Sequence, residues 1–120
     1  MLEALAMSLI ISLILTIVVE VTVSLFLGVW EPEDTDIVVR VNCITNPVVV
    51  TISFFVQELS GSMIAKYAVL IVLEVLVVWT ETKMYRRWLT ACETKPFKLA
   101  LVLNVFSFGL GVVLDILCLL

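Results

Sequence analysis

Two glutamates lie inside long apolar segments of the chain. Glu20 belongs to the segment IVVEVTV, and Glu74 belongs to the segment IVLEVLV. An ionised carboxylate in the middle of a membrane costs several kcal/mol, so such a residue is either protonated or paired with another group. A carboxyl in this position is suited to binding and releasing a proton or a cation. Both glutamates are therefore candidate ion-binding residues.

Amides and hydroxyls recur in the apolar segments that follow these glutamates. The segment VNCITNP carries Asn42 and Thr45, and the segment LNVFSFG carries Asn104 and Ser107 at matching places. Because polar side chains are rare inside membrane spans, this agreement is more informative than an agreement of valines or leucines. At a rise of 1.5 Å per residue, these groups lie roughly 10–20 Å from one end of their helices, in one layer. The sequence predicts a substrate- or ion-binding site made of Glu20, Glu74, Asn42, Asn46, Asn104 and Ser107.

The same polar residues also have a purely structural interpretation. Small residues at every fourth position let helices approach closely, and hydrogen bonds from Asn and Ser hold membrane bundles together. The first apolar segment has such a ridge, at Ser8, Ser12, Thr16, Glu20, Ser24 and Gly28. Taken singly, Asn42, Thr45, Asn104 and Ser107 favour this packing role. Glu20 and Glu74 instead favour a role in binding.

Pro47 directly follows Asn46 within the second apolar segment. Proline removes a backbone donor and leaves the carbonyl one turn earlier, here that of Cys43, without its usual partner. We expect a helix break at Pro47. The carbonyl that it frees would lie beside the amides, as in the polar sites of many transporters.

Arg40 lies in the same segment but about 160° away from Asn42 around the helix. We expect it to pair on the cytoplasmic side, either with Asp36 one turn earlier or with Glu81 in the third apolar segment. Snorkelling of Arg40 to the lipid headgroups is the alternative. Glu81 itself is expected near the membrane interface, solvated or paired with neighbouring basic residues.

The composition indicates an integral membrane protein. Of 120 residues, 62% are hydrophobic and 15% are charged, and the mean hydropathy is +1.22. A soluble domain is close to half apolar, with about a quarter of its residues charged. Four apolar segments reach the roughly 20 residues that a bilayer requires, at 5–30, 37–59, 64–88 and 97–120. The predicted fold is all-α, a single four-helix transmembrane domain over residues 1–120.

The four segments read as two tandem hairpins, at 5–59 and 64–120. IVVEVTV and IVLEVLV agree in five of seven places, which aligns Glu20 with Glu74. Two hairpins of the same orientation imply a parallel repeat with a pseudo-two-fold axis along the membrane normal.

Basic residues predict the orientation in the membrane. Loops that carry Lys and Arg face the cytoplasm. The third connection and its flanks hold Lys83, Arg86, Arg87, Lys95 and Lys98. The loops at 31–36 and 83–98 are therefore expected in the cytoplasm, with both termini outside.

Several classes of function are not expected. The chain contains no histidine and its three cysteines form no CxxC pair, so no metal site of the usual kinds is expected. It has no glycine-rich phosphate loop and no HExxH motif, and no nucleophile has an imidazole base. We expect no enzymatic activity and no cofactor. Because the sequence has no basic patch of the kind that binds nucleic acid, no nucleic-acid partner is expected.

The segments VVEV, VNCITNP, VLEVLVVWTETKMYRR and LNVFSFGLG together resemble a group of small prokaryotic four-span integral membrane proteins. The resemblance extends over nearly the whole chain. It implies a four-span fold in a prokaryotic cytoplasmic (inner) membrane and carries no activity. Small multidrug resistance transporters are of similar size and carry a glutamate in their first span, but the residues around Glu20 do not match theirs.

Two functions remain. The first is a transporter or channel for a cation or small polar solute that uses the predicted layer of Glu, Asn and Ser residues. Since one chain of four helices encloses little volume, a second copy of the chain is expected in a homo-oligomer. The second is a non-catalytic membrane subunit, scaffold or assembly factor in which the layer only packs helices. In both cases the lipid bilayer surrounds the chain.

Overall fold

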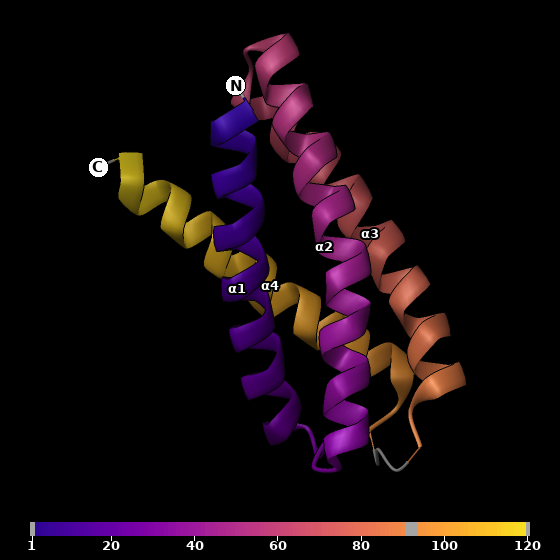
Figure 1. The fold of residues 1–120 in the computed structure, drawn as a ribbon. Helices are drawn as coiled ribbons and strands as arrows, with labels where there is room; N and C mark the ends of the chain where they lie inside the picture. The colour runs from indigo at the N-terminus through magenta and orange to yellow at the C-terminus, as the bar shows by residue number, and fades with distance from the viewer. Residues whose placement is uncertain (1, 91–93, 120) are drawn as a thin grey trace.

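The computed structural model describes residues 2–90 and 94–119 and places four helices in this part of the chain (Figure 1). Within these residues there is no β-strand. The helices are α1 (Leu2–Phe26), α2 (Pro32–Ser60), α3 (Met63–Trp88) and α4 (Pro96–Leu119). The all-α prediction with four long helices is confirmed.

Each of the four helices is long and apolar enough to cross a membrane. The outer surface carries exposed large apolar side chains along every helix, among them Ile14, Val48, Val75 and Val105. An extended apolar exterior of this kind is unfavourable in water and favourable in the hydrocarbon of a bilayer. The chain therefore has the features of an integral membrane protein.

The boundaries of the first two helices differ from those predicted. α1 ends at Phe26, before Gly28, whose φ of 93° is a left-handed conformation that only glycine adopts readily. α2 begins at Pro32, so most of the expected loop at 31–36 is the first turn of a helix. Proline fits the first position of a helix, and the acidic residues Glu33 and Asp34 stabilise its positive end.

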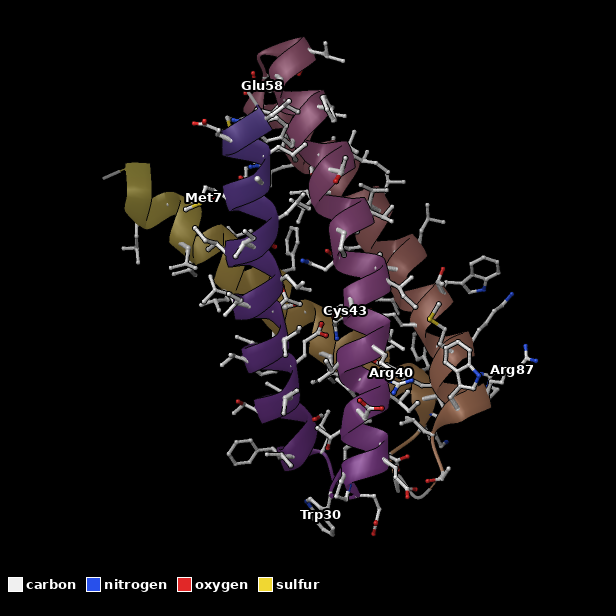
Figure 2. The ribbon with its side chains drawn as sticks, in the orientation of Figure 1. Met7, Trp30, Arg40, Cys43, Glu58 and Arg87 are labelled. Carbon is white, nitrogen blue, oxygen red and sulfur yellow. The ribbon has the colours of Figure 1, made fainter. Side chains whose placement is uncertain are left out.

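α2 continues through Pro47 without interruption, from Pro32 to Ser60. The predicted helix break at Pro47 is therefore wrong. Proline inside a helix removes one hydrogen bond, and the remaining bonds on both sides keep the helix continuous. Cys43 is the residue whose carbonyl was expected to lie beside the amides. Its side chain is exposed on the outer face of α2 (Figure 2).

Each helix packs against two neighbours, so that α1, α2, α3 and α4 form a closed ring. Both termini lie at the same end of the bundle as the short link between α2 and α3 (Figure 1). We call this the terminal end. The links between α1 and α2 and between α3 and α4 lie at the opposite end, which we call the loop end.

The apolar core is concentrated at the loop end. At this end Asp34 of α2 is hydrogen-bonded to Thr90, which follows α3. The Asp34 Oδ1 accepts hydrogen bonds from the backbone N–H and the hydroxyl of Thr90, at 2.9 and 3.1 Å. The Thr94 hydroxyl donates to the carbonyl of Leu27 and thereby ties the α4 side to the end of α1. The core residues are Val29, Val38, Val41, Tyr85, Leu99, Ala100 and Leu103.

Candidate functional site

A cavity of about 790 Å³ lies between the four helices on the terminal side of this core. At the terminal end α4 diverges from α2 and α3 (Figure 1), which leaves room for the cavity. Its volume is within the range of small-molecule binding sites. The polar residues of the predicted layer that line it are Asn42, Asn46, Glu74, Asn104 and Ser107, together with Ser8, Ser12, Thr16 and Thr45.

Glu81 lies beneath the floor of the cavity and is fully buried. Its Oε1 accepts a hydrogen bond from the Thr45 hydroxyl at 2.9 Å, and its Oε2 accepts one from the Asn104 amide at 2.5 Å. This carboxyl therefore joins α2, α3 and α4 at one point.

Glu20 is also fully buried beneath the floor. Its Oε1 accepts a hydrogen bond from the Ser107 hydroxyl at 3.2 Å, and the Asn42 side chain approaches the same carboxyl. Its Oε2 is buried and has no hydrogen-bond partner in the described part of the chain. Glu20 therefore joins α1 to α2 and α4, in the same way as Glu81 joins α3 to α2 and α4.

The two asparagines of the floor are held in the same way. The amide of Asn42 donates to the carbonyl of Val38 at 2.9 Å, and that of Asn104 donates to the carbonyl of Ala100 at 2.8 Å. In each case the acceptor lies one turn earlier in the same helix. Both amides are thereby fixed toward the carboxyl that lies next to them.

The expected position of Glu81 is wrong. It was placed near the interface, solvated or beside Arg40, whereas the structure buries it in the polar layer. Arg40 instead pairs with Asp36 through Nε at 2.8 Å, the other of the two predicted partners, and both side chains are mostly exposed. Figure 2 shows Arg40 on the outer side of α2 near the loop end.

Asn46 lies in the wall of the cavity. Its Oδ1 faces the hydroxyls of Ser12 and Thr16 on α1, at 3.3 and 3.5 Å. Its Nδ2 is buried, and no residue in 2–90 or 94–119 accepts a hydrogen bond from it. An unpartnered buried donor is costly, so this amide has free capacity to bind a polar group in the cavity.

Glu74 lines the cavity from α3. Its Oε2 is buried and has no hydrogen-bond partner, and no described residue donates a side-chain hydrogen bond to either oxygen. Glu74 is close enough to Glu20 and Glu81 for their charges to interact, although these carboxyls are not hydrogen-bonded to one another. Glu74, which lines the cavity, is thus the carboxyl of this layer that accepts no hydrogen bond from a described side chain.

Tyr85 lies on the loop side of the two buried carboxyls and separates them from that end. Its side chain is fully buried in the apolar core, and its hydroxyl has no hydrogen-bond partner among the described residues. It is near enough to Glu81 and Glu20 to interact with their charges.

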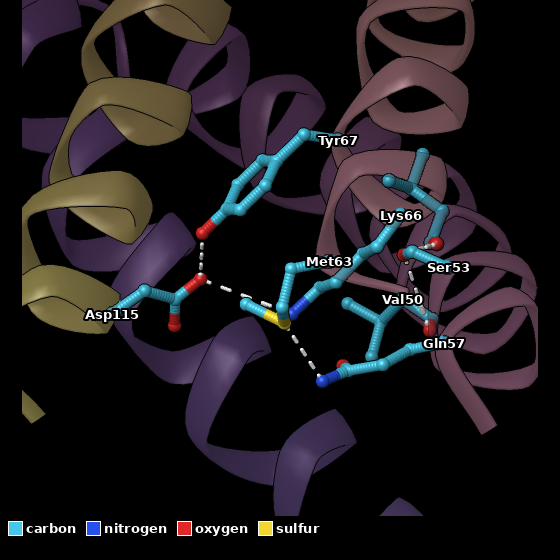
Figure 3. A network of polar contacts seen from close by, with 8 residues as sticks. Val50, Ser53, Gln57, Met63, Lys66, Tyr67 and Asp115 are labelled. Carbon is cyan, nitrogen blue, oxygen red and sulfur yellow. Dashed lines mark hydrogen bonds and ion pairs between the residues drawn. The ribbon is translucent and has the colours of Figure 1, made fainter. Parts of the chain in front are cut away.

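A second polar group lies at the mouth of the cavity (Figure 3). Asp115 on α4 accepts a hydrogen bond from the Tyr67 hydroxyl at 2.6 Å and pairs with Lys66 Nζ at 3.8 Å, both on α3. Lys66 is the one basic residue among the described residues that line the cavity. Because Asp115 holds it at the mouth, the deeper part of the cavity has acidic and amide groups without a described basic partner.

Within residues 2–90 and 94–119, no three acidic or cysteine side chains come together as metal ligands. The arrangement instead provides one accessible carboxyl, a set of amides and hydroxyls, and apolar walls. Such a lining can hold a monovalent or organic cation or a small polar solute.

Comparison with known protein families, curated proteins and solved structures finds no match for the chain. The fold class and the site therefore rest on the chain's own geometry. They define a four-helix, all-α chain whose helices are suited to crossing a membrane and enclose a polar layer. The resemblance to small prokaryotic four-span membrane proteins stays a prediction.

The six predicted site residues come together around the cavity, five in its lining and Glu20 behind it. Glu81 and Tyr85 were not predicted to be members of the same layer. A signal was present, since Glu74, Glu81 and Tyr85 recur at seven and four residues and so share one face of a helix.

Proposed function

We propose that this chain is a small membrane transporter for a cation or small polar solute, which binds in the cavity against Glu74 and Asn46. No enzymatic activity is proposed. The proposal is supported by chemistry at one depth of the bundle, where a carboxyl, an amide and several hydroxyls face a common space.

Glu74 carries the proposal. Its carboxyl faces the cavity with a buried oxygen that no described group satisfies. Burying a charged or polar group without a partner costs several kcal/mol, so the arrangement favours a ligand that supplies the missing partner. A cation supplies it by charge, and a hydroxyl or amine supplies it by a hydrogen bond.

Glu20 and Glu81 have a different role in this proposal. Both are enclosed by protein and joined to neighbouring helices, so they position the floor and do not contact the solute. Their amide and hydroxyl partners form the surface on which the solute rests. A change in the charge of either carboxyl would alter how these helices meet.

Transport requires access from both sides in turn. The lining of the cavity extends to Met7, Gln57 and Asp115 near the terminal end, whereas the apolar core and the Asp34–Thr90 contact close the loop end. We propose that this conformation gives access from the outside, because positive charge places the loop end in the cytoplasm. Release would require the loop end to part while the terminal end closes.

We further propose that the two hairpins are a tandem repeat with a pseudo-two-fold axis along the membrane normal. The matching positions of Asn42 and Asn104, and of Thr45 and Ser107, support it. In this repeat Glu20 of the first hairpin corresponds to Glu81 of the second hairpin. This correspondence replaces the alignment of Glu20 with Glu74 that the sequence suggested. A homo-oligomer remains part of the proposal. The small volume of a single chain no longer supports it, because one chain already encloses a cavity of about 790 Å³.

The alternative is a scaffold or assembly factor in which the layer only holds helices together. The interhelical hydrogen bonds of Glu20 and Glu81 favour it, because they need no ligand to explain them. They do not explain Glu74, which makes no such bond. The two functions therefore differ in what they predict for this residue.

The test is ion and proton flux in proteoliposomes, for the wild-type chain and Glu74→Gln. We expect flux of one cation in the wild type and its loss in the variant. Glu58→Gln is the matched control, since Glu58 is exposed near the terminal end of α2 and does not line the cavity (Figure 2). Absence of flux for protons, sodium, potassium and divalent cations from folded wild type would remove ion transport and leave an uncharged solute or the scaffold.

A further inference from the structure

A second cavity, of about 710 Å³, lies between α3 and α4 on the outer side of the bundle. We call it the α3–α4 groove. Its edges are formed by exposed apolar side chains, namely Ile71, Val75, Trp79, Leu101 and Val105. Since these side chains face outward along two apolar helices, the groove opens to the hydrocarbon of the bilayer.

One end of the α3–α4 groove is basic. Lys83 and Arg86 line it near the end of α3, and neither makes a salt bridge with a described acidic residue. Lys83 lies over the ring of Trp79, with Nζ 3.8 Å from the ring centre. Tryptophan and basic side chains at the end of a membrane helix are typical of the headgroup region.

The length of the groove matches one leaflet. Ile71 and Lys83 are twelve residues apart on one helix, which corresponds to about 18 Å at the helical rise. Half of the hydrocarbon core of a bilayer is about 15 Å thick. A molecule with its charged group at Lys83 and its apolar part along the groove therefore has the dimensions of a lipid in that leaflet.

We propose that an anionic phospholipid occupies the α3–α4 groove, with its phosphate on Lys83 and Arg86 and an acyl chain along α3 and α4. Two positive charges at the entrance disfavour an organic cation as the occupant. A soluble anion does not use the apolar length of the groove. Basic pockets between membrane helices are known to bind anionic headgroups in this way.

The proposed lipid would also form one wall of the site. Glu74, Asn104 and Phe108 line both the central cavity and the α3–α4 groove. An acyl chain in the groove covers these residues from the bilayer side, and so confines access to Glu74 to the central cavity. This inference needs the helices to span a membrane, but it does not depend on transport.

The experiment is titration of the purified chain in detergent with phosphatidylglycerol and with phosphatidylcholine, followed by native mass spectrometry. We expect tighter binding of phosphatidylglycerol. At about 1 kcal/mol for each basic residue, Arg86→Gln should weaken it roughly 5-fold and Lys83→Gln/Arg86→Gln roughly 30-fold. Arg87→Gln removes the same charge from the adjacent exposed residue, which lies outside the groove (Figure 2), and should change binding less than about 2-fold.

A variant that leaves every charge in place tests the apolar part. Val105→Trp fills the groove at an exposed position and should weaken phosphatidylglycerol binding. Equal binding of the two lipids, or equal losses for Arg86→Gln and Arg87→Gln, would overturn the proposal. The proposal would also be overturned if millimolar inorganic phosphate displaced the lipid and Val105→Trp bound phosphatidylglycerol as well as the wild type. Those results together would show a site for the headgroup alone.

Discussion

Glu20 and Glu81 hold corresponding positions in the polar layer. Each is fully buried, each accepts a hydroxyl hydrogen bond from the other hairpin, and each lies beside the asparagine of its own hairpin. The donor to Glu81 is Thr45 on α2, and the donor to Glu20 is Ser107 on α4. The four helices are thus joined in sequence around the bundle by two carboxyls. Of the three carboxyls in this layer, Glu74 is the one without a hydrogen bond from any described residue.

Replacing Glu81 by leucine should destabilise the bundle. Glu81→Leu removes two interhelical hydrogen bonds, which are worth about 0.6 kcal/mol each on average in membrane proteins, and leaves Asn104 and Thr45 with only their backbone acceptors. We expect the free energy of unfolding in mixed micelles to fall by about 1–2 kcal/mol. Glu74→Leu is the matched control and should not lower it, because it removes an unpartnered buried oxygen and no hydrogen bond to a described residue. Equal losses for the two variants would contradict the distinction between structural and ligand-binding carboxyls.

Removing the hydroxyl of Tyr85 should not destabilise the chain. The oxygen is buried and has no hydrogen-bond partner, and desolvating such a group costs about 1–3 kcal/mol. Tyr85→Phe keeps the ring in the apolar core and should raise the thermal unfolding midpoint or leave it unchanged. Leu103→Ala, which removes apolar volume from the same core, should lower it. A lower midpoint for Tyr85→Phe would mean that the hydroxyl has a bonding partner in the membrane.

The cavity should admit a membrane-impermeant thiol reagent from the terminal side. In a background with Cys43, Cys92 and Cys118 replaced by serine, Gly111→Cys places a thiol in the lining, where an added Cβ meets no atom within 4 Å. We expect it to react at least about ten times faster than Leu103→Cys, whose position is fully buried. If both termini face outward, the thiol of Gly111→Cys should react faster with reagent added outside right-side-out vesicles than with reagent added from the cytoplasmic side. Faster reaction from the cytoplasmic side would reverse the predicted orientation.

Asp115 should control the charge at the mouth. In Asp115→Asn, Lys66 loses its ion-pair partner, and a free positive charge then faces an entering cation. If the cargo is a cation, we expect the KM of transport to rise about 3- to 10-fold at low ionic strength, with little change in kcat. Lys66→Gln/Asp115→Asn removes both charges and should restore the KM. A KM that does not respond to either substitution would place the entry path elsewhere.

The helices were predictable because long apolar runs dominate their formation. Each of the three predicted connections holds a Pro or a Gly, and α3 begins within one residue of its predicted start. The start of α2 was missed because EPEDTD is polar and reads as a turn. Yet Pro32 and the acids after it are also a favourable first turn of a helix. Pro47 was misjudged for the opposite reason, because a proline in a long membrane helix removes one bond without ending it.

The site was predictable as a layer but not in its pairing. Counting residues brings Glu20, Asn42 and Asn104 to similar depths, whatever the packing. Glu81 lies at the same depth but is followed closely by Lys83 and Arg86, which suggested an interface and a salt bridge. The structure turns those two basic side chains outward and Glu81 inward. Depth follows from the sequence, whereas the direction in which a helix faces depends on the neighbours it packs against.

The position of the chain ends has a practical consequence. Both termini lie at the terminal end (Figure 1), beside the mouth marked by Lys66 and Asp115. A fluorescent protein or affinity tag joined there by a short linker would stand over the mouth of the cavity and, under the proposed function, slow the exchange of solute. The loop end is instead filled by the apolar core. An insertion at the connection between α1 and α2 would therefore report expression and folding while leaving the entrance free.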